Sequence, residues 1–95
     1  MSLIIYPKGF LYILALRGGT RYCGITTNLQ QRIKQHKSGM SKSTRHKLPL
    51  ELCYVKEFEN MSKARELEKM IKQQGVTRWY IKNVYILTLF SAQVI

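Results

Sequence analysis

The sequence predicts an α+β domain in which helices flank a three-stranded, mostly antiparallel β-sheet. Three observations favour this class: a glycine-centred hairpin pattern, a later apolar strand, and helical segments that follow each of them. The 95 residues suit one domain, 1–95, with an ordinary apolar content of 45%.

The hairpin is predicted from two segments, 10–16 and 21–26, that are rich in aliphatic and aromatic residues. Gly18 and Gly19 lie between them and supply the positive φ angles that a tight turn requires. Phe10, Tyr12 and Leu14 share one face of the first strand, and apolar residues also occupy its other face. We therefore expect a central strand that is covered on both sides.

The first helix is predicted to begin at Thr27-Asn28, run to about Ser38 and stop at Gly39. Residues 37–47 form a loop that is rich in serine and basic residues and has no acid. The third strand is expected over 50–58 because this segment is again apolar and aromatic.

A second helix is predicted from Asn60-Met61-Ser62 to about Gly75, with Ala64, Leu67 and Ile71 as its buried stripe. Thr77 is expected to cap a third helical segment that ends near Phe90. This C-terminal segment, about 76–95, follows the core of the domain, about 9–75, and is expected to cover the sheet.

The charge pattern points to a polyanionic partner. The formal net charge is +11, and all five acids are glutamates in the second half of the chain. Nucleic acid is the first partner to consider, an anionic membrane surface is the second, and a solvated basic face without a partner is the alternative.

Other features narrow the class of protein. No apolar run is long enough to cross a bilayer, and the N-terminus has no signal-peptide pattern. Cys23 and Cys53 lack CxxC spacing and are expected to be small core residues of a cytoplasmic protein. With His36 and His46 they do not make a zinc pattern, and no phosphate-binding glycine loop or serine-hydrolase motif is present.

Several polar residues occupy positions where a packing residue is the usual choice. Glu68 completes the apolar stripe of the second helix, so its charge needs either a basic partner or a metal ion. Arg32 and His36 lie four residues apart on the first helix, either as ordinary surface groups or as a phosphate site. Tyr12 and Tyr22 are expected to approach one another across the hairpin, where packing is the ordinary role.

Gly24 has no turn to make inside its strand. We interpret it as a bulge or as a place where another backbone or a ligand comes close.

These features coincide with a known signature. Phe10-Leu11-Tyr12 occupies the place of Gly-Ile-Tyr, and Tyr22-Cys23-Gly24 that of Tyr-Ile-Gly. The segments 25–36, 43–58 and 68–72 follow in the order and spacing of the later motifs. The chain thus resembles the GIY-YIG nuclease superfamily, especially its short stand-alone bacterial branch, which is akin to the excision-repair nuclease module.

The resemblance implies an endonuclease that hydrolyses DNA with one Mg²⁺ or Mn²⁺ held by Glu68, with no small-molecule cofactor. It implies that Tyr12 is the general base, that Tyr22 supports it, and that Arg32 binds the scissile phosphate. His36 would assist proton transfer or orient the phosphate. The basic residues expected to contact the DNA backbone are Lys34, Lys37, Lys42, Arg45 and Lys47. We also expect the positive field to lower the pKa of Tyr12.

Departures from the pattern are few. Phe10, Leu11 and Cys23 replace glycine and isoleucine at strand positions where packing decides, so they do not indicate an inactive enzyme. Ser43 stands where an aromatic residue is common, which leaves the DNA contacts of that loop open.

Because no targeting domain is recognised in this sequence, we expect low sequence specificity or recognition of branched or damaged DNA. Such an activity would serve DNA repair or recombination. RNA as substrate, a protein partner and the oligomeric state stay open. One rival function is a non-catalytic nucleic-acid-binding module of the same fold, and the other is a structural or partner-binding protein. The nuclease hypothesis requires Glu68, Arg32 and the two tyrosines to meet around one concave spot. A Glu68 carboxylate on the opposite side of the sheet from Tyr12 and Arg32 would contradict it.

Overall fold

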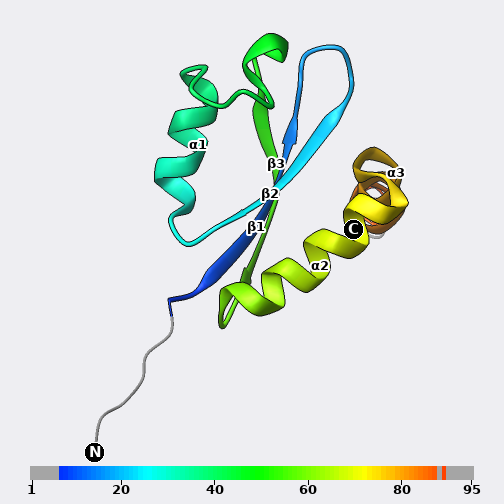
Figure 1. Cartoon of the computed structure of the whole chain (residues 1–95). Helices are drawn as coiled ribbons and strands as arrows, with labels where there is room; N and C mark the ends of the chain where they lie inside the picture. The colour runs from blue at the N-terminus through cyan, green and yellow to red at the C-terminus, as the bar shows by residue number, and fades with distance from the viewer. Residues whose placement is uncertain (1–6, 88, 90–95) are drawn as a thin grey trace, which may run out of the picture.

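The computed structural model describes residues 7–87 and 89, and Figure 1 shows their arrangement in three layers. The sheet has the strand order β2-β1-β3, from β1 (Gly9–Ala15), β2 (Arg21–Thr26) and β3 (Glu51–Phe58), and every pairing is antiparallel. Helix α1 (Leu29–Lys37) covers one face, while α2 (Met61–Gln74) and α3 (Val76–Tyr80) cover the other. The predicted α+β class is confirmed.

Strand β1 is the central strand, as predicted, and the side chains on its two faces belong to two separate hydrophobic cores. Leu11 and Ile13 pack with Cys23, Ile71 and Trp79 beneath α2 and α3. On the opposite face, Tyr12, Leu14 and Leu50 pack with partly buried residues that include Leu29 and Ile33 of α1. Alternate side chains of a strand point to opposite faces, so β1 links the two layers.

Local signals place the helix and hairpin boundaries where they were expected. Asn28 and Asn60 cap α1 and α2, and each accepts a hydrogen bond through its side chain from the backbone N–H three residues on. Gly18 and Gly19 have φ angles of 94° and 90° in the hairpin turn. The predicted stripe of α2 is also buried, with Ala64 and Ile71 at 0% exposure.

The third helix differs from the prediction. Its N-cap is Gly75, with φ 94°, and Thr77 lies inside the helix, so the capping role predicted for Thr77 is wrong. Gly75 ends α2 and the chain turns into α3 at once, which leaves no room for a cap two residues later. The helical path continues through a π-helical segment, η2 (Ile81–Tyr85), to Leu87, and the predicted end at Phe90 lies outside the described residues.

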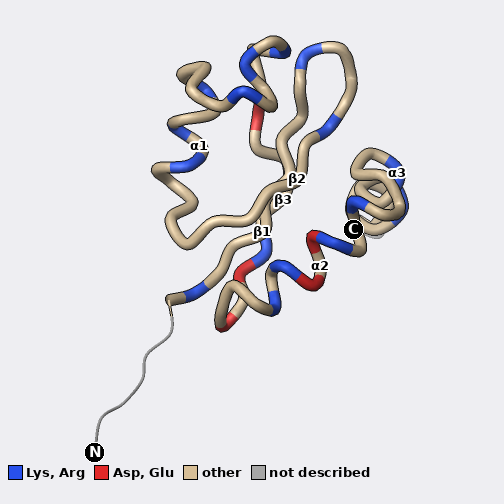
Figure 2. Tube along the Cα trace, viewed as in Figure 1, with Lys and Arg blue, Asp and Glu red and all other residues tan. Residues whose placement is uncertain are grey.

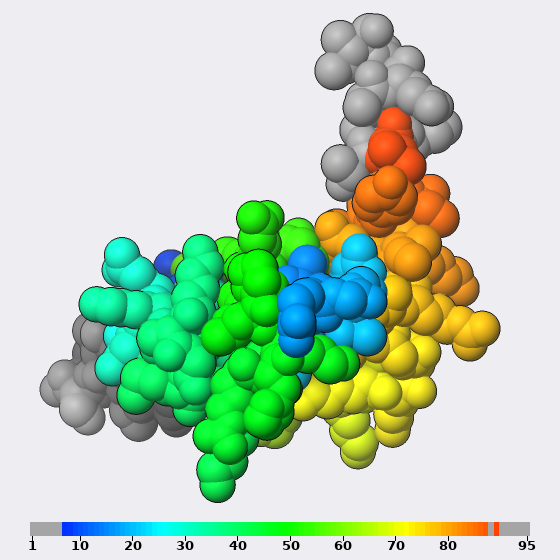
Figure 3. All heavy atoms as spheres, turned by 90° about the horizontal axis from the view of Figure 1, so that it is seen from above, coloured from blue at the N-terminus to red at the C-terminus, as the bar shows by residue number. Residues whose placement is uncertain are grey.

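One end of the sheet carries the loop that follows α1. Its short 3₁₀ helix, η1 (Arg45–Lys47), lies beside the β1–β2 turn, because the Arg17 backbone N–H donates to the carbonyl of Lys47 over 2.9 Å. Figure 3 shows this loop in green next to the blue turn. Cys23 is buried, Cys53 is partly buried, and both are free thiols. Within residues 7–87 and 89, no helix has the length and apolar character needed to span a membrane.

Candidate functional site

A chain of three buried polar side chains joins β1, α1 and the loop after α1. The Tyr12 hydroxyl lies 2.9 Å from Nε2 of His36, and the Nδ1 of the same ring lies 2.8 Å from Oγ1 of Thr44. Tyr12 is 1% exposed, and His36 and Thr44 are 0% exposed. Both nitrogens of His36 are therefore occupied, so this histidine is neither a surface group nor a simple C-terminal cap.

Tyr22 adds a third ring to this cluster from the edge strand β2. Its ring centroid lies 6.4 Å from that of Tyr12 and 5.3 Å from that of His36. The expected approach of the two tyrosines across the hairpin is thus present. Tyr22 is partly exposed, whereas Tyr12 is buried, so solvent reaches the cluster more readily at Tyr22.

Gly24 makes room for Tyr12. The two residues are paired in the β1–β2 register, and a Cβ atom at Gly24 would lie 2.5 Å from Cζ of Tyr12. A bulge or an approach by another backbone or a ligand was expected at this glycine, but the group that comes close is a tyrosine ring of the same chain. Any side chain at position 24 would displace that ring.

Arg32 is a cation that acts on the phenol of Tyr12. It is partly buried on α1, donates a hydrogen bond to Oε1 of Gln35 over 3.0 Å, and interacts with the Tyr12 hydroxyl strongly enough to affect its pKa. Arg32, His36, Tyr12 and Tyr22 therefore gather on one face of the sheet. This part of the predicted constellation is brought together by the fold.

The expectation that the positive field lowers the pKa of Tyr12 is wrong. Burial raises the pKa of this phenol above its ordinary value, and Arg32 opposes the rise without cancelling it. Burial also lowers the pKa of His36, and the charge of Arg32 adds to that effect. At neutral pH the cluster thus pairs a protonated phenol with a neutral imidazole.

Glu68 belongs to the other layer. Its helix α2 covers the face of the sheet opposite to α1, so Glu68 extends from a different layer than Tyr12 and Arg32. The physical reason is that Ile71 and Leu67 of α2 pack on Ile13 and Cys23, and Glu68, with 18% of its side chain exposed, lies beside them on the same helix.

Helix α2 thus lies opposite Tyr12 and Arg32, but the condition for rejecting the nuclease hypothesis concerns the Glu68 carboxylate, and this group is linked through Lys72 to Tyr22, which packs on the Tyr12 face. The Oε2 atom of Glu68 is 3.3 Å from Nζ of Lys72, and the same Nζ lies 5.9 Å from the ring centroid of Tyr22. Burial, and then the charge of Glu68, raise the pKa of Cys23 on β2 to about 12. A single lysine side chain therefore links the carboxylate to the tyrosine cluster around the edge strand β2.

The donor set suits a weakly held hard cation. Among residues 7–87 and 89, no three or more His, Cys, Asp or Glu side chains come together as a metal site. Glu68 is one carboxylate with 18% of its side chain exposed, and Lys72 holds its Oε2 as a competing cation. A single carboxylate fits Mg²⁺ or Mn²⁺, which keep several waters in such sites.

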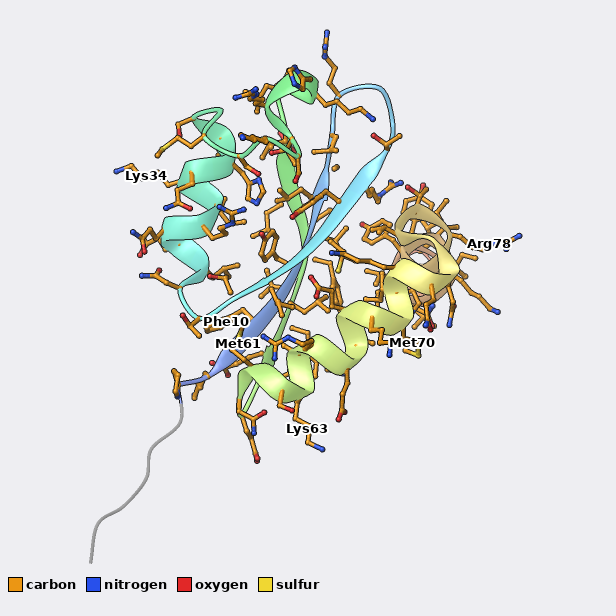
Figure 4. The ribbon with its side chains drawn as sticks, viewed as in Figure 1. Phe10, Lys34, Met61, Lys63, Met70 and Arg78 are labelled. Atoms are coloured by element: carbon orange, nitrogen blue, oxygen red, sulfur yellow. The ribbon has the colours of Figure 1, made fainter. Side chains whose placement is uncertain are left out.

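The basic residues predicted to contact DNA lie on α1 and in the loop after it. Lys34, Lys37, Lys42, Arg45 and Lys47 are all exposed. Figure 2 shows basic residues at the end of the sheet where this loop meets the hairpin turn, and Figure 4 shows Lys34 pointing away from the sheet. Arg17 joins them, because its guanidinium donates to the carbonyl of His46 over 2.9 Å.

Two residues of the site had no predicted role. Thr44 resembles its serine neighbours in the loop, and only its buried contact with His36 distinguishes it. Lys72 had a usable signal, because it lies four residues after Glu68, the spacing of a helical ion pair.

Comparison with known proteins defines the class. Residues 8–80 match the GIY-YIG catalytic domain, and the chain belongs to this family, which is associated with nuclease activity on DNA and whose nucleases typically use divalent metal ions.

Within the family, the chain is similar to UPF0213 proteins. It is 43% identical over 65 residues to that of Oceanobacillus iheyensis, covering 67% of this chain and 76% of the relative. The UPF0213 protein of Streptococcus pneumoniae serotype 4 is 35% identical over 68 residues, 70% of this chain and 69% of the relative. The solution structure of the UPF0213 protein BH0048 from Bacillus halodurans has 34% identity, covers 70% of this chain and 71% of that one, and superposes with a TM-score of 0.46.

Proposed function

We propose that this protein is a divalent-metal-dependent endonuclease that hydrolyses phosphodiester bonds of DNA, with low sequence specificity or with a preference for branched or damaged structures. The observation that carries the proposal is the buried Tyr12–His36 pair beside Arg32, inside a domain that belongs to a catalytic family. A pure binding surface has no need of a buried phenol hydrogen-bonded to a neutral imidazole.

Tyr12 and His36 act together as the base. Because burial keeps Tyr12 protonated, its phenol can take a proton from the attacking water only as its own proton leaves. Nε2 of His36, 2.9 Å away on a neutral ring, accepts that proton. The water oxygen bonds to phosphorus, the bond from phosphorus to the leaving sugar oxygen breaks, and that oxygen takes a proton from solvent. Tyr22, the more exposed phenol, orients the water or the Tyr12 ring.

Charge on the phosphate is balanced from two sides. The Arg32 guanidinium binds a non-bridging oxygen in the transition state, where its planar donors are strongest. Glu68 would hold Mg²⁺ or Mn²⁺, which when bound stabilises the negative charge on the leaving oxygen. Because Glu68 approaches from the other layer, we place the scissile phosphate at the outer edge of β2 beside Tyr22, where groups from both faces of the sheet come within reach of it.

The exposed cations contact the DNA backbone on both sides of that phosphate. Lys37, Lys42, Arg45 and Lys47 lie toward the end of the sheet, and Lys34 lies on α1. They carry no information about base sequence, which is consistent with recognition of DNA shape.

A cleavage panel tests the proposal. Linear duplex, flap, branched and lesion-containing DNA are incubated with the protein and Mg²⁺ or Mn²⁺, with and without chelator, and Glu68→Ala is the blank for contaminating nucleases. Metal-dependent cutting that Glu68→Ala lacks is the expected result. Equal cutting by the variant, or none on any substrate, contradicts the proposal.

One observation favours a second candidate, the non-catalytic nucleic-acid-binding module. Glu68 is paired with Lys72 and belongs to the layer opposite Arg32, as an ordinary structural ion pair would. Salt-dependent DNA binding that Glu68→Ala leaves unchanged, without cleavage of any substrate in the panel, would establish this alternative.

A further inference from the structure

Thr44 is buried although its side chain is polar. Its Oγ1 lies 2.8 Å from Nδ1 of His36, and both side chains are 0% exposed. The residue is the N-cap of η1, and its backbone carbonyl accepts from the N–H of Lys47 while its own N–H donates to the carbonyl of Ser41. The hydroxyl therefore extends from a well-anchored turn onto the far side of the imidazole from Tyr12.

The donors and acceptors of Tyr12, His36 and Thr44 limit where the proton of the imidazole ring can lie. A neutral imidazole has one N–H donor and one acceptor nitrogen, and a guanidinium only donates. The positive charge of Arg32 acts on the phenol, which favours an arrangement in which the Tyr12 oxygen faces that charge and the Tyr12 O–H is directed to Nε2 of His36. In this arrangement the Nδ1 atom carries the ring proton and donates it to Thr44 Oγ1.

The reverse arrangement blocks proton transfer. If Thr44 donated to Nδ1, the ring proton would lie on Nε2 and point at Tyr12. The imidazole would then have no free lone pair for the phenolic proton. The groups that face the ring are Arg32 on α1, Tyr12 on β1, Tyr22 on β2 and Thr44 on the loop, with Lys72 of α2 near Tyr22.

We propose that Thr44 is a positioning residue, which fixes His36 as the Nδ1–H tautomer and so leaves Nε2 free to receive the proton of Tyr12. The inference rests on the proposed nuclease function for its catalytic meaning, but the tautomer itself does not depend on activity. Thr44 also adjoins Arg45, so the loop that carries DNA-binding cations holds the catalytic ring in place.

Two variants separate the hydroxyl from the shape of the side chain. Thr44→Val keeps the size and removes the hydroxyl, while Thr44→Ser keeps the hydroxyl. The chain has only two histidines, so a ¹⁵N–¹H correlation spectrum of the imidazole rings is simple, and His46→Gln assigns them. It is recorded at a pH where both rings are neutral.

The wild type and Thr44→Ser are expected to show His36 protonated at Nδ1, and Thr44→Val is expected to lose this preference. In single-turnover cleavage, Thr44→Val should be slower by about 10–100-fold, as for other lost orienting partners, with DNA affinity unchanged, and Thr44→Ser should recover most of the rate.

A wild-type ring protonated at Nε2 overturns the proposal even if Thr44→Val fails to fold. Retention of the Nδ1–H form and of the rate in Thr44→Val overturns it as well. If the wild type cuts no DNA while the spectra change as expected, the nuclease function fails and the role of Thr44 in fixing His36 stands.

Discussion

At the scale of single residues, burial rather than net charge sets the chemistry of the site. Tyr12 is surrounded by a strongly basic chain, yet its pKa is raised because the ring lies against Gly24 and beneath α1. The sequence shows the charges but not how deeply a side chain is buried, so the pKa shift of Tyr12 was predicted in the wrong direction. The raised pKa gives His36 a defined task, since a protonated phenol needs an acceptor.

Replacing Gly24 with alanine tests how tightly Tyr12 is held. The added methyl group meets the Tyr12 ring, so Gly24→Ala should lower the free energy of unfolding by about 1–3 kcal/mol, as overpacking generally does. Chemical denaturation measures this. In a Tyr12→Leu background, where the ring is absent, the same alanine should cost much less. An equal cost in both backgrounds would mean that the ring does not occupy this space.

His36 should make stability depend on pH. Burial lowers its pKa below the ordinary 6.5, so the unfolded chain binds more protons than the folded one just below that value. The free energy of unfolding should therefore fall as pH drops from 6.5 toward the lowered pKa of His36. Above pH 6.5 the ring is neutral in both states, so the stabilisation from keeping His36 neutral is fully present. Urea unfolding across this range measures it.

The matched controls are the two histidine substitutions. His36→Gln should remove this part of the pH dependence, while the exposed His46→Gln should keep it. A wild-type slope that survives in His36→Gln would show that other groups are responsible.

At the scale of elements, local signals predicted the boundaries well and the relation between layers poorly. The glycines of the hairpin and the asparagine caps act within a few residues, so their sequence context is sufficient. The stripe of α2 indicated which side of that helix is buried, but not which face of the sheet it covers. Glu68 was therefore expected beside Tyr12, whereas it reaches the site only around the edge of β2.

Lys72 should weaken metal binding at Glu68, because a cation cannot share that carboxylate without repulsion. Lys72→Met keeps most of the side-chain volume and removes the charge. Mn²⁺ affinity, followed by electron paramagnetic resonance, should rise about two- to fivefold, the range of exposed ion pairs. Glu68→Ala should abolish the binding. Unchanged affinity in Lys72→Met, or binding that persists in Glu68→Ala, would exclude Glu68 as the metal ligand.

The loop after α1 should provide phosphate contacts. Arg45→Gln should reduce the slope of log affinity against log salt concentration by about 1, because one fewer counterion is released. Fluorescence anisotropy with a short duplex measures the slope. Lys63→Gln is the control, since Figure 4 shows Lys63 on α2, pointing away from the sheet. Equal loss in both variants would indicate a diffuse field without a defined surface.

At the scale of the whole molecule, the edge strand β2 is where the two layers act together. Tyr22 lies on the α1 face and Cys23 on the α2 face, so one strand presents both sets of groups. The sequence order of the motifs identified the family, and residues 8–80 match the GIY-YIG catalytic domain. The motifs also selected Tyr12, Tyr22 and His36, whose rings the fold brings together, but not Thr44. The sequence did not predict that Glu68 and the tyrosines lie on either side of the edge strand β2, because this arrangement depends on how α2 packs on the sheet.

The central claim is that Tyr12 from one face and Glu68 from the other act on the same phosphodiester. Single-turnover cleavage of the best substrate by the wild type, Tyr12→Phe, Glu68→Ala and the double variant tests it most directly. Each single variant should be slower by about 100-fold or more, and the double variant no slower than the slower single one, because groups in one step are not additive. Cleavage by Tyr12→Phe or by Glu68→Ala at the wild-type rate would contradict the account.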